Sequence, residues 1–159
     1  MKQFIVVGLG RFGSSVATTL ANKGYDVLAI DVNEELVQEI SSEVTHSVQA
    51  DATDEEALDT LGVDEFDIAI VAIGSNVHAN ILASLILKEL GVPHVVAKAQ
   101  DKLHGKLLSK VGADKVVYPE RDMGARVANN LVSANVLDYI ELAPNYSIAE
   151  IIASDKLSE

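Results

Sequence analysis

Three glycines in one short turn form the anion-binding motif of this sequence. They lie in the segment GLGRFG, residues 8–13, directly after an apolar run and directly before a helical pattern. In such a turn Gly8 permits a tight bend, Gly10 lets the backbone approach a phosphate, and Gly13 allows close helix–strand packing. The helix that follows offers free N–H groups and a partial positive charge. The segment therefore predicts a phosphate-binding turn.

An acidic residue stands where a ribose would lie. Asp31 ends the next predicted strand, and a carboxylate at that place accepts hydrogen bonds from ribose hydroxyls. It would repel a 2′-phosphate, which disfavours NADP. We expect Val32 to lie beside it in the same site. The alternative is that Asp31 only caps the following helix, a role for which Asn33 competes.

Small and polar residues follow three further predicted strands, at the edge where open α/β sheets bind ligands. The group at residues 51–53 could frame the adenine or the ribose, the group at residues 73–76 could close over the nucleoside, and Lys98 could bind phosphates. For the first two groups the alternative is a turn or helix cap, and for the lysine it is solvation. These residues are Asp51, Ala52 and Thr53; Ile73, Gly74, Ser75 and Asn76; and Lys98.

Two charged residues could sense how many phosphates are bound. Arg11 lies inside the glycine turn beside Phe12 and can bind terminal phosphate oxygens in a bidentate manner; a surface salt bridge is its alternative. Glu120 follows the last predicted strand, and phosphates would repel it unless a divalent cation, Mg²⁺ or Ca²⁺, lay between them. Its alternative is a favourable charge in the first turn of a helix.

The sequence lacks the motifs of several other kinds of nucleotide-binding, catalytic and metal-binding sites. There is no GxxxxGK[ST] loop, no GxSxG elbow, no tyrosine four residues before a lysine, and no cysteine, and the four histidines lack metal-ligand spacing. Nothing resembles an apparatus that activates water, so we expect no enzymatic activity.

Composition limits the partners. The chain has 159 residues, 48% apolar and 23% charged, which is typical of one soluble globular domain. A net charge of −12 argues against binding to nucleic acid or anionic lipid. No apolar run approaches the roughly 20 residues that span a bilayer. The sequence therefore predicts a cytoplasmic protein without direct membrane insertion.

Short apolar runs alternate with helical patterns and predict an α/β fold, a doubly wound parallel six-stranded Rossmann-type sheet. The strands are expected at Gln3–Val7, Asp26–Ile30, His46–Ala50, Asp67–Ala72, His94–Ala97 and Lys115–Tyr118. The helices are expected near Phe12–Lys23, Asn33–Ser42, Asp54–Leu61, Asn76–Leu90 and Lys102–Val111, with N-caps at Asn33 and Asp54.

The C-terminal part of the sequence predicts one more helix and one more strand. A longer helix is expected from about Met123 to Tyr139, and after a break at Pro144 another strand at Ser147–Ala153. We therefore divide the chain into residues 1–139, a nucleotide-binding domain, and residues 140–159, a linker and strand that begins a C-terminal lobe or pairs across an oligomer. Candidate oligomer contacts are Ile81, Leu85 and Leu131.

The ordered set of motifs resembles the RCK (TrkA N-terminal) domains, and within them the cytosolic regulatory subunits of Ktr-type potassium uptake systems. The resemblance covers about residues 2–150. It rests on the glycine turn, Asp31, and the segments at residues 51–53, 72–74, 98–100 and 112–120 (DAT, AIG, KAQ and GAD…PE).

The resemblance implies a function. Such subunits form homo-oligomeric rings, usually octameric, beneath a membrane potassium-translocating subunit, so the chain would lie at the inner face of the cell membrane. They bind ATP or ADP, with NAD(H) also known in the family, and the nucleotide changes the ring and gates the partner. By resemblance Arg11 contacts the distal phosphate, Glu120 binds a divalent cation, and the long helix is a crossover helix. Only the first strand of the usual C-terminal lobe is present, so no further regulator site is expected here.

Two other functions use the same turn. An NAD(H)-binding redox sensor or dehydrogenase fits the glycines and Asp31, but a dehydrogenase also needs a substrate pocket and a proton-transfer group. A nucleoside-dependent methyltransferase also uses an acidic residue after the second strand, but Arg11 favours phosphates.

Overall fold

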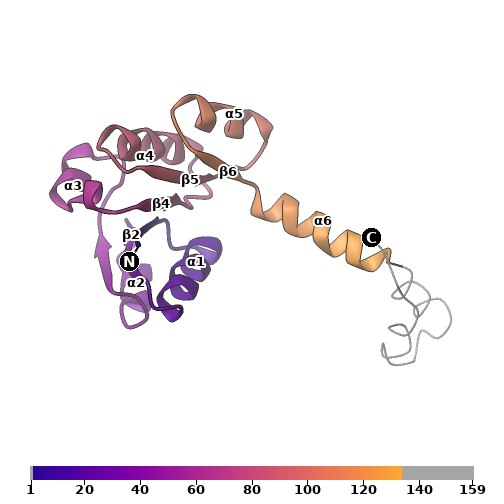
Figure 1. Ribbon diagram of the computed structural model, residues 1–159, viewed down its shortest axis with the longest axis horizontal. Coiled ribbons are helices and arrows are strands. Elements are labelled where there is room, and N and C mark those ends of the chain that lie inside the picture. The colour runs from indigo at the N-terminus through magenta and orange to yellow at the C-terminus, as the bar shows by residue number, and fades with distance from the viewer. Residues whose placement is uncertain (1, 134–159) are drawn as a thin grey trace. The chain divides into compact units, whose positions relative to one another are not determined.

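The computed structural model describes residues 2–133, in which six parallel strands form one sheet (Figure 1). The strand order is β3-β2-β1-β4-β5-β6, which confirms the predicted doubly wound topology. The strands are β1 (Gln3–Val7), β2 (Asp26–Asp31), β3 (His46–Gln49), β4 (Ile68–Val71), β5 (His94–Lys98) and β6 (Lys115–Val117).

Helices follow the strands. They are α1 (Arg11–Asn22), α2 (Glu34–Ile40), α3 (Glu55–Thr60), α4 (Val77–Glu89) and α5 (Lys102–Lys110), with a 3₁₀ helix, η1 (Val63–Glu65), after α3. The predicted N-caps are confirmed, since Asn33 Oδ1 accepts the N–H of Glu35 and Asp54 Oδ1 that of Glu56. Both satisfy backbone donors that a helix start leaves unpaired.

Two apolar cores lie on the two faces of the sheet. Ile5 and Val7 of β1 belong to the core that α3, α4 and α5 cover, and Phe4 and Val6 belong to the core under α1 and α2. Figure 1 shows these two groups of helices on opposite sides of the strands. Burial on both faces explains why the strands read as nearly continuous apolar runs instead of alternating patterns.

A polar side chain just before one strand accepts a backbone N–H near the start of the neighbouring strand. Asp67, just before β4, accepts the Gln3 N–H of β1 at 2.7 Å through Oδ2. Thr45, just before β3, accepts the Val27 N–H of β2 at 3.0 Å through Oγ1. Buried backbone donors need such partners, so these side chains fix where each pair of strands begins.

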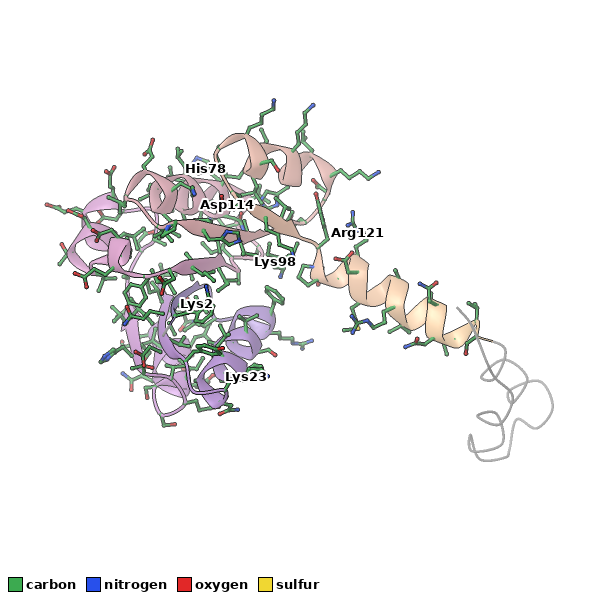
Figure 2. All side chains as sticks on the ribbon, viewed as in Figure 1. Lys2, Lys23, His78, Lys98, Asp114 and Arg121 are labelled. Carbon is green, nitrogen blue, oxygen red and sulfur yellow. The ribbon has the colours of Figure 1, made fainter. Side chains whose placement is uncertain are left out.

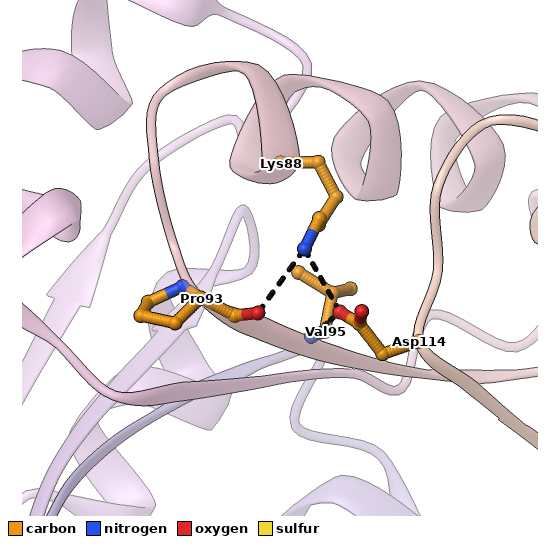
Figure 3. Close-up of polar contacts among 4 residues, drawn as sticks. All are labelled: Lys88, Pro93, Val95 and Asp114. Carbon is orange, nitrogen blue, oxygen red and sulfur yellow. Dashed lines mark hydrogen bonds and ion pairs between the residues drawn. The ribbon is translucent and has the colours of Figure 1, made fainter.

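Asp114, just before β6, accepts a backbone N–H near the start of β5 and also forms an ion pair. Its Oδ2 accepts the Val95 N–H at 2.7 Å and lies 3.0 Å from Lys88 Nζ, which also donates to Pro93 O at 3.1 Å (Figure 3). Burial alone would raise the pKa of the Asp114 carboxyl, but the Val95 N–H and the Lys88 ammonium outweigh it and hold the pKa below its usual value. The charged form therefore stabilises the start of β5.

The chain divides into two units, residues 1–118 and 119–159. In the second unit, α6 runs from Pro119 to Leu131. The helix thus begins four residues before the predicted Met123, because proline is well suited to the first helical position and Glu120 and Asp122 favour the first turn. The predicted boundary after residue 139 and the strand at Ser147–Ala153 lie outside the described residues and stay predictions.

We expect Asp114→Asn to lower the free energy of unfolding by about 1 kcal/mol at neutral pH, since the amide keeps an acceptor but loses the charge. Because the pKa of Asp114 is lowered in the folded state, this stabilisation is present above the ordinary aspartate pKa of about 4 and is lost as the pH falls through and below it. Urea unfolding of both proteins at several pH values measures the difference.

The matched control is Asp122→Asn, which removes the carboxylate of an exposed pair with Arg121 at 3.3 Å. Its effect should stay within about 0.5 kcal/mol. A difference for Asp114→Asn that is equally small at pH 7, or that grows on acidification, would contradict this account.

Candidate functional site

A cavity of about 660 Å³ lies at the carboxyl ends of the central strands, where the strand order reverses. All predicted site residues of the first unit except Gly13 line it. They are Gly8, Gly10, Arg11, Phe12, Asp31, Val32, Asp51, Ala52, Thr53, Ile73, Gly74, Ser75, Asn76 and Lys98. The sequence analysis missed further lining residues: Val7, Leu9, Asn33, Ala50 and Ala72, which adjoin predicted ones in the chain, and Leu36 and Ala79, which lie on α2 and α4.

The glycine turn brings α1 close to the sheet. Gly8 has φ +97°, and a Cβ there would lie 2.8 Å from the backbone nitrogen of Ile73, so only glycine fits. A Cβ on Gly13 would overlap the carbonyl oxygen of Gly8. Gly10 differs, since it has φ −71° and a Cβ there would meet nothing within 4 Å. Gly8 and Gly13 are therefore needed for packing, whereas Gly10 leaves open space beside the backbone.

The start of α1 has no side-chain cap and no acidic residue in its first turn. The other helices that pack on the sheet do have capping side chains, which are those of Asn33, Asp54, Asn76 and Asp101. Uncapped N–H groups and the positive end of the helix dipole together attract an anion. Among the α-helices within residues 2–118, the one without a side-chain cap is therefore α1, whose start, Arg11 and Phe12, lines the cavity.

Asp31 holds the glycine turn in place, a role that sequence reasoning missed. Its Oδ2 accepts the Leu9 N–H at 2.7 Å and its Oδ1 accepts the Asn33 N–H at 2.8 Å. The N-cap of α2 is Asn33, so the capping alternative for Asp31 is wrong. A carboxylate has about four acceptor positions, so Asp31 can still accept a hydrogen bond from a ribose hydroxyl.

Asp51 contributes a second negative charge to the cavity. The Thr53 hydroxyl donates to its Oδ1 at 2.6 Å and the Thr53 N–H donates at 2.9 Å, and these bonds hold the pKa of Asp51 below its usual value. Asp51 therefore forms a tight local turn, and Asp54 is the cap of α3. Asn76, by contrast, both caps α4, accepting the Ala79 N–H at 3.0 Å, and lines the cavity.

Two cationic residues, Arg11 and Lys98, also line the cavity. Among residues 2–133 no carboxylate lies within 4 Å of the charged nitrogens of Arg11 or Lys98, which disfavours the salt-bridge alternative for Arg11. Lys98 Nζ lies 5.8 Å from the centroid of the Phe12 ring and 3.2 Å from the place of a Cβ on Gly74 (Figure 2). Thus Asp31 ends β2 and Asp51 follows β3, whereas Arg11 follows β1 and Lys98 ends β5.

The predicted divalent-cation site at Glu120 lies in the second unit of the chain. Glu120 is the second residue of α6. Within the described part of the chain, no three histidine, aspartate or glutamate side chains gather as metal ligands. A cation at Glu120 would therefore need ligands from a nucleotide or from water, and its binding there stays a prediction.

The strand order, the glycine turn and the acidic residue after β2 together define a Rossmann-type domain with a crevice suited to a nucleotide. Comparison with known families is more specific. The model of the TrkA-N domain matches residues 4–119, and the chain belongs to this family.

The chain is 51% identical over 157 residues to the Ktr system potassium uptake protein C of Bacillus subtilis (strain 168), an alignment that covers 99% of this chain and 71% of that protein. Two solved structures share the fold. The GsuK channel bound to NAD has a TM-score of 0.72 and 19% identity over 80% of this chain and 23% of that one. GsuK bound to ADP has a TM-score of 0.73 and 18% identity over 84% of this chain and 35% of that one.

We expect Gly13→Ala and Gly10→Ala to behave differently. A methyl group at residue 13 must displace backbone, so Gly13→Ala should lower the free energy of unfolding by about 3 kcal/mol. A methyl group at residue 10 meets open space at an allowed φ, so Gly10→Ala should cost less than about 1 kcal/mol. Urea unfolding measures both. Equal losses would mean that the turn differs from the one described.

Proposed function

We propose that this chain is a regulatory nucleotide-binding subunit that gates a membrane potassium transporter through ATP- and ADP-dependent changes in an oligomeric ring. The family and the name of its relative, a Ktr system potassium uptake protein, support the potassium transporter as the partner. GsuK, a channel with the same fold, has solved structures bound to NAD and bound to ADP, which supports an adenine nucleotide as the ligand.

The observation that carries the proposal is the distribution of charge in the cavity. The uncapped start of α1, Arg11 and Lys98 suit a diphosphate or triphosphate. Asp31, on the side of β2, suits the ribose hydroxyls that ATP, ADP and NAD(H) share. The whole crevice has room for a nucleotide, because ligand pockets of drug-sized molecules occupy roughly 300–1,000 Å³.

Gating requires a ligand that binds two states of the ring with different affinity. ATP differs from ADP by the γ-phosphate, which adds negative charge near Arg11. A divalent cation would balance this charge. In our proposal Arg11 binds the distal phosphate and Glu120 holds Mg²⁺ or Ca²⁺ beside it. The glutamate alone would repel the phosphate, so ATP and the cation bind together.

In this proposal the ring is a homo-oligomer, an octamer, in the cytoplasm against the inner face of the membrane. No helix in the described residues is both long and apolar enough to span a bilayer, so the membrane contact is assigned to the potassium-translocating partner. Of the three predicted contact residues, Leu131 is exposed on α6, whereas Ile81 and Leu85 are half-buried on α4. The ring contacts of all three stay predictions.

An NAD(H)-binding redox sensor is the second candidate, because Asp31 fits the adenosine ribose of NAD(H) equally well. A dehydrogenase fits less well. The titratable residues that line the cavity are Arg11, Asp31, Asp51 and Lys98, and histidine, the side chain most often used for proton transfer, is not among them. We therefore propose a binding subunit and not an enzyme.

Calorimetric titration with ATP, ADP, NADH and NADPH, each with and without Mg²⁺, tests the proposal. ATP and ADP should bind with dissociation constants on the order of micromolar or tighter, and NADPH should bind more weakly than NADH because its 2′-phosphate meets Asp31. Arg11→Gln should weaken ATP binding about tenfold, and Glu120→Gln should remove the effect of Mg²⁺.

Lys23→Gln is the matched control, since Lys23 lies just after the other end of α1 and outside the cavity (Figure 2). It should leave all affinities unchanged. Tight NADH binding without measurable ATP or ADP binding would overturn the ATP/ADP switch and favour the redox sensor.

A further inference from the structure

Three polar residues form a hydrogen-bonded cluster next to residues that line the cavity: Asn80 of α4 and His104 of α5, which are buried, and Gln100 after β5, which is exposed. Asn80 is 0% and His104 3% exposed, and neither belongs to the residues that line the cavity. Burying polar side chains is costly unless each hydrogen-bonding group finds a partner, so their bonds show what the cluster does.

Asn80 joins the ends of two strands. Its side-chain nitrogen donates to the carbonyl oxygen of Ile73, beyond β4, at 2.7 Å and to that of Lys98, the last residue of β5, at 3.0 Å. Both acceptors belong to residues that line the cavity. A rotated amide would place its oxygen against two carbonyl oxygens, so these bonds fix the orientation of the Asn80 side chain.

His104 holds Asn80 in that orientation. Its Nδ1 accepts the Gln100 N–H at 3.0 Å, so the ring proton lies on Nε2, which donates to Asn80 Oδ1 at 3.0 Å. Burial lowers the pKa of His104, against the opposing effect of Asp101, and so favours the neutral ring that this arrangement requires. Asp101 also binds the His104 N–H at 2.8 Å, which fixes the start of α5.

Gln100 completes the connection to the cavity. Its side-chain nitrogen donates to the carbonyl oxygen of Gly74, and Gly74 is the residue against which Lys98 Nζ lies. The cluster thus holds both the backbone from which Lys98 extends and the loop that its ammonium group contacts.

We propose that Asn80 and His104 are positioning residues for Lys98, which set the reach of its ammonium group to the phosphates of the bound nucleotide. This inference rests on the proposed nucleotide site. It assigns a role in ligand binding to residues of α4 and α5 that do not line the cavity. Residues that orient a ligand-binding group commonly change affinity when they are replaced.

A double-mutant cycle with ADP as the probe tests the inference. Asn80→Ala should weaken ADP binding about tenfold in the otherwise unchanged protein, and should have little further effect when Lys98→Met is already present, because the residue acts through Lys98. Calorimetry gives the affinities, and thermal unfolding of each variant ensures that binding is measured on folded protein.

Two His104 variants provide an independent measurement in case Asn80→Ala does not fold. His104→Leu removes the donor to Asn80 and should weaken ADP binding by a similar factor. His104→Gln retains an N–H near the position of Nε2 and should recover part of the loss. Ser84→Ala is the matched control, since Ser84 is also 0% exposed on α4 but donates only to the Asn80 backbone oxygen at 2.9 Å; ADP binding should be unchanged.

The outcomes separate the two proposals. If the unaltered protein does not bind ADP, the ADP site and this inference both fail. If it binds ADP and Lys98→Met weakens binding, but Asn80→Ala and His104→Leu do not, the inference alone is wrong. It is also wrong if Asn80→Ala weakens binding by the same factor with and without Lys98.

Discussion

The close approach of α1 to the ends of β1 and β4 is the constraint on which the site depends. Gly13 lies where any side chain would overlap the carbonyl oxygen of Gly8, and a Cβ on Gly8 would lie 2.8 Å from the backbone nitrogen of Ile73. Asp31 adds a hydrogen bond to the Leu9 N–H that ties the turn to β2. The start of α1, Arg11 and Phe12, therefore lines the cavity, and no side chain caps it.

That geometry determines where each charge belongs. Since β2 and β3 lie on one side of β1, their terminal carboxylates, Asp31 and Asp51, gather on that side, whereas Lys98 ends β5 on the other. A nucleotide has the same polarity, with ribose donors at one end and phosphates at the other. A protein with a net charge of −12 thus places positive groups where phosphates would lie.

Much of this arrangement was predictable because its signals are local. Apolar runs such as Gln3–Val7 mark buried parallel strands, and Asn33 and Asp54 mark helix starts; the structure confirms all of these. The cavity follows from them, since the carboxyl ends of parallel strands meet at one edge. The family, too, was recognisable from the order of motifs, and the match to the TrkA-N domain confirms it.

What could not be predicted depends on contacts between distant parts of the chain. Asp31 and Leu9 are 22 residues apart, and His104 and Asn80 are 24 apart, so neither pair leaves a periodic signal. The spacing of His104 showed only that it is not part of a metal motif. The start of α6 was missed for a different reason: the apolar pattern begins only at Met123, whereas the helix begins with Pro119 and the acidic Glu120.

Backbone amide NMR of the isotope-labelled protein during titration with ADP tests the central claim most directly, because it reports on the N–H groups themselves. The account predicts that the largest shifts occur at the start of α1, at Gly10, Arg11 and Phe12. A second hollow between α1 and α2 shares Gly10 and Arg11 with the cavity, but Thr18, Glu39 and Glu43 line only the second hollow, so their amides serve as the internal comparison. Shifts at these three amides, with those of Gly10, Arg11 and Phe12 unchanged, would contradict the account.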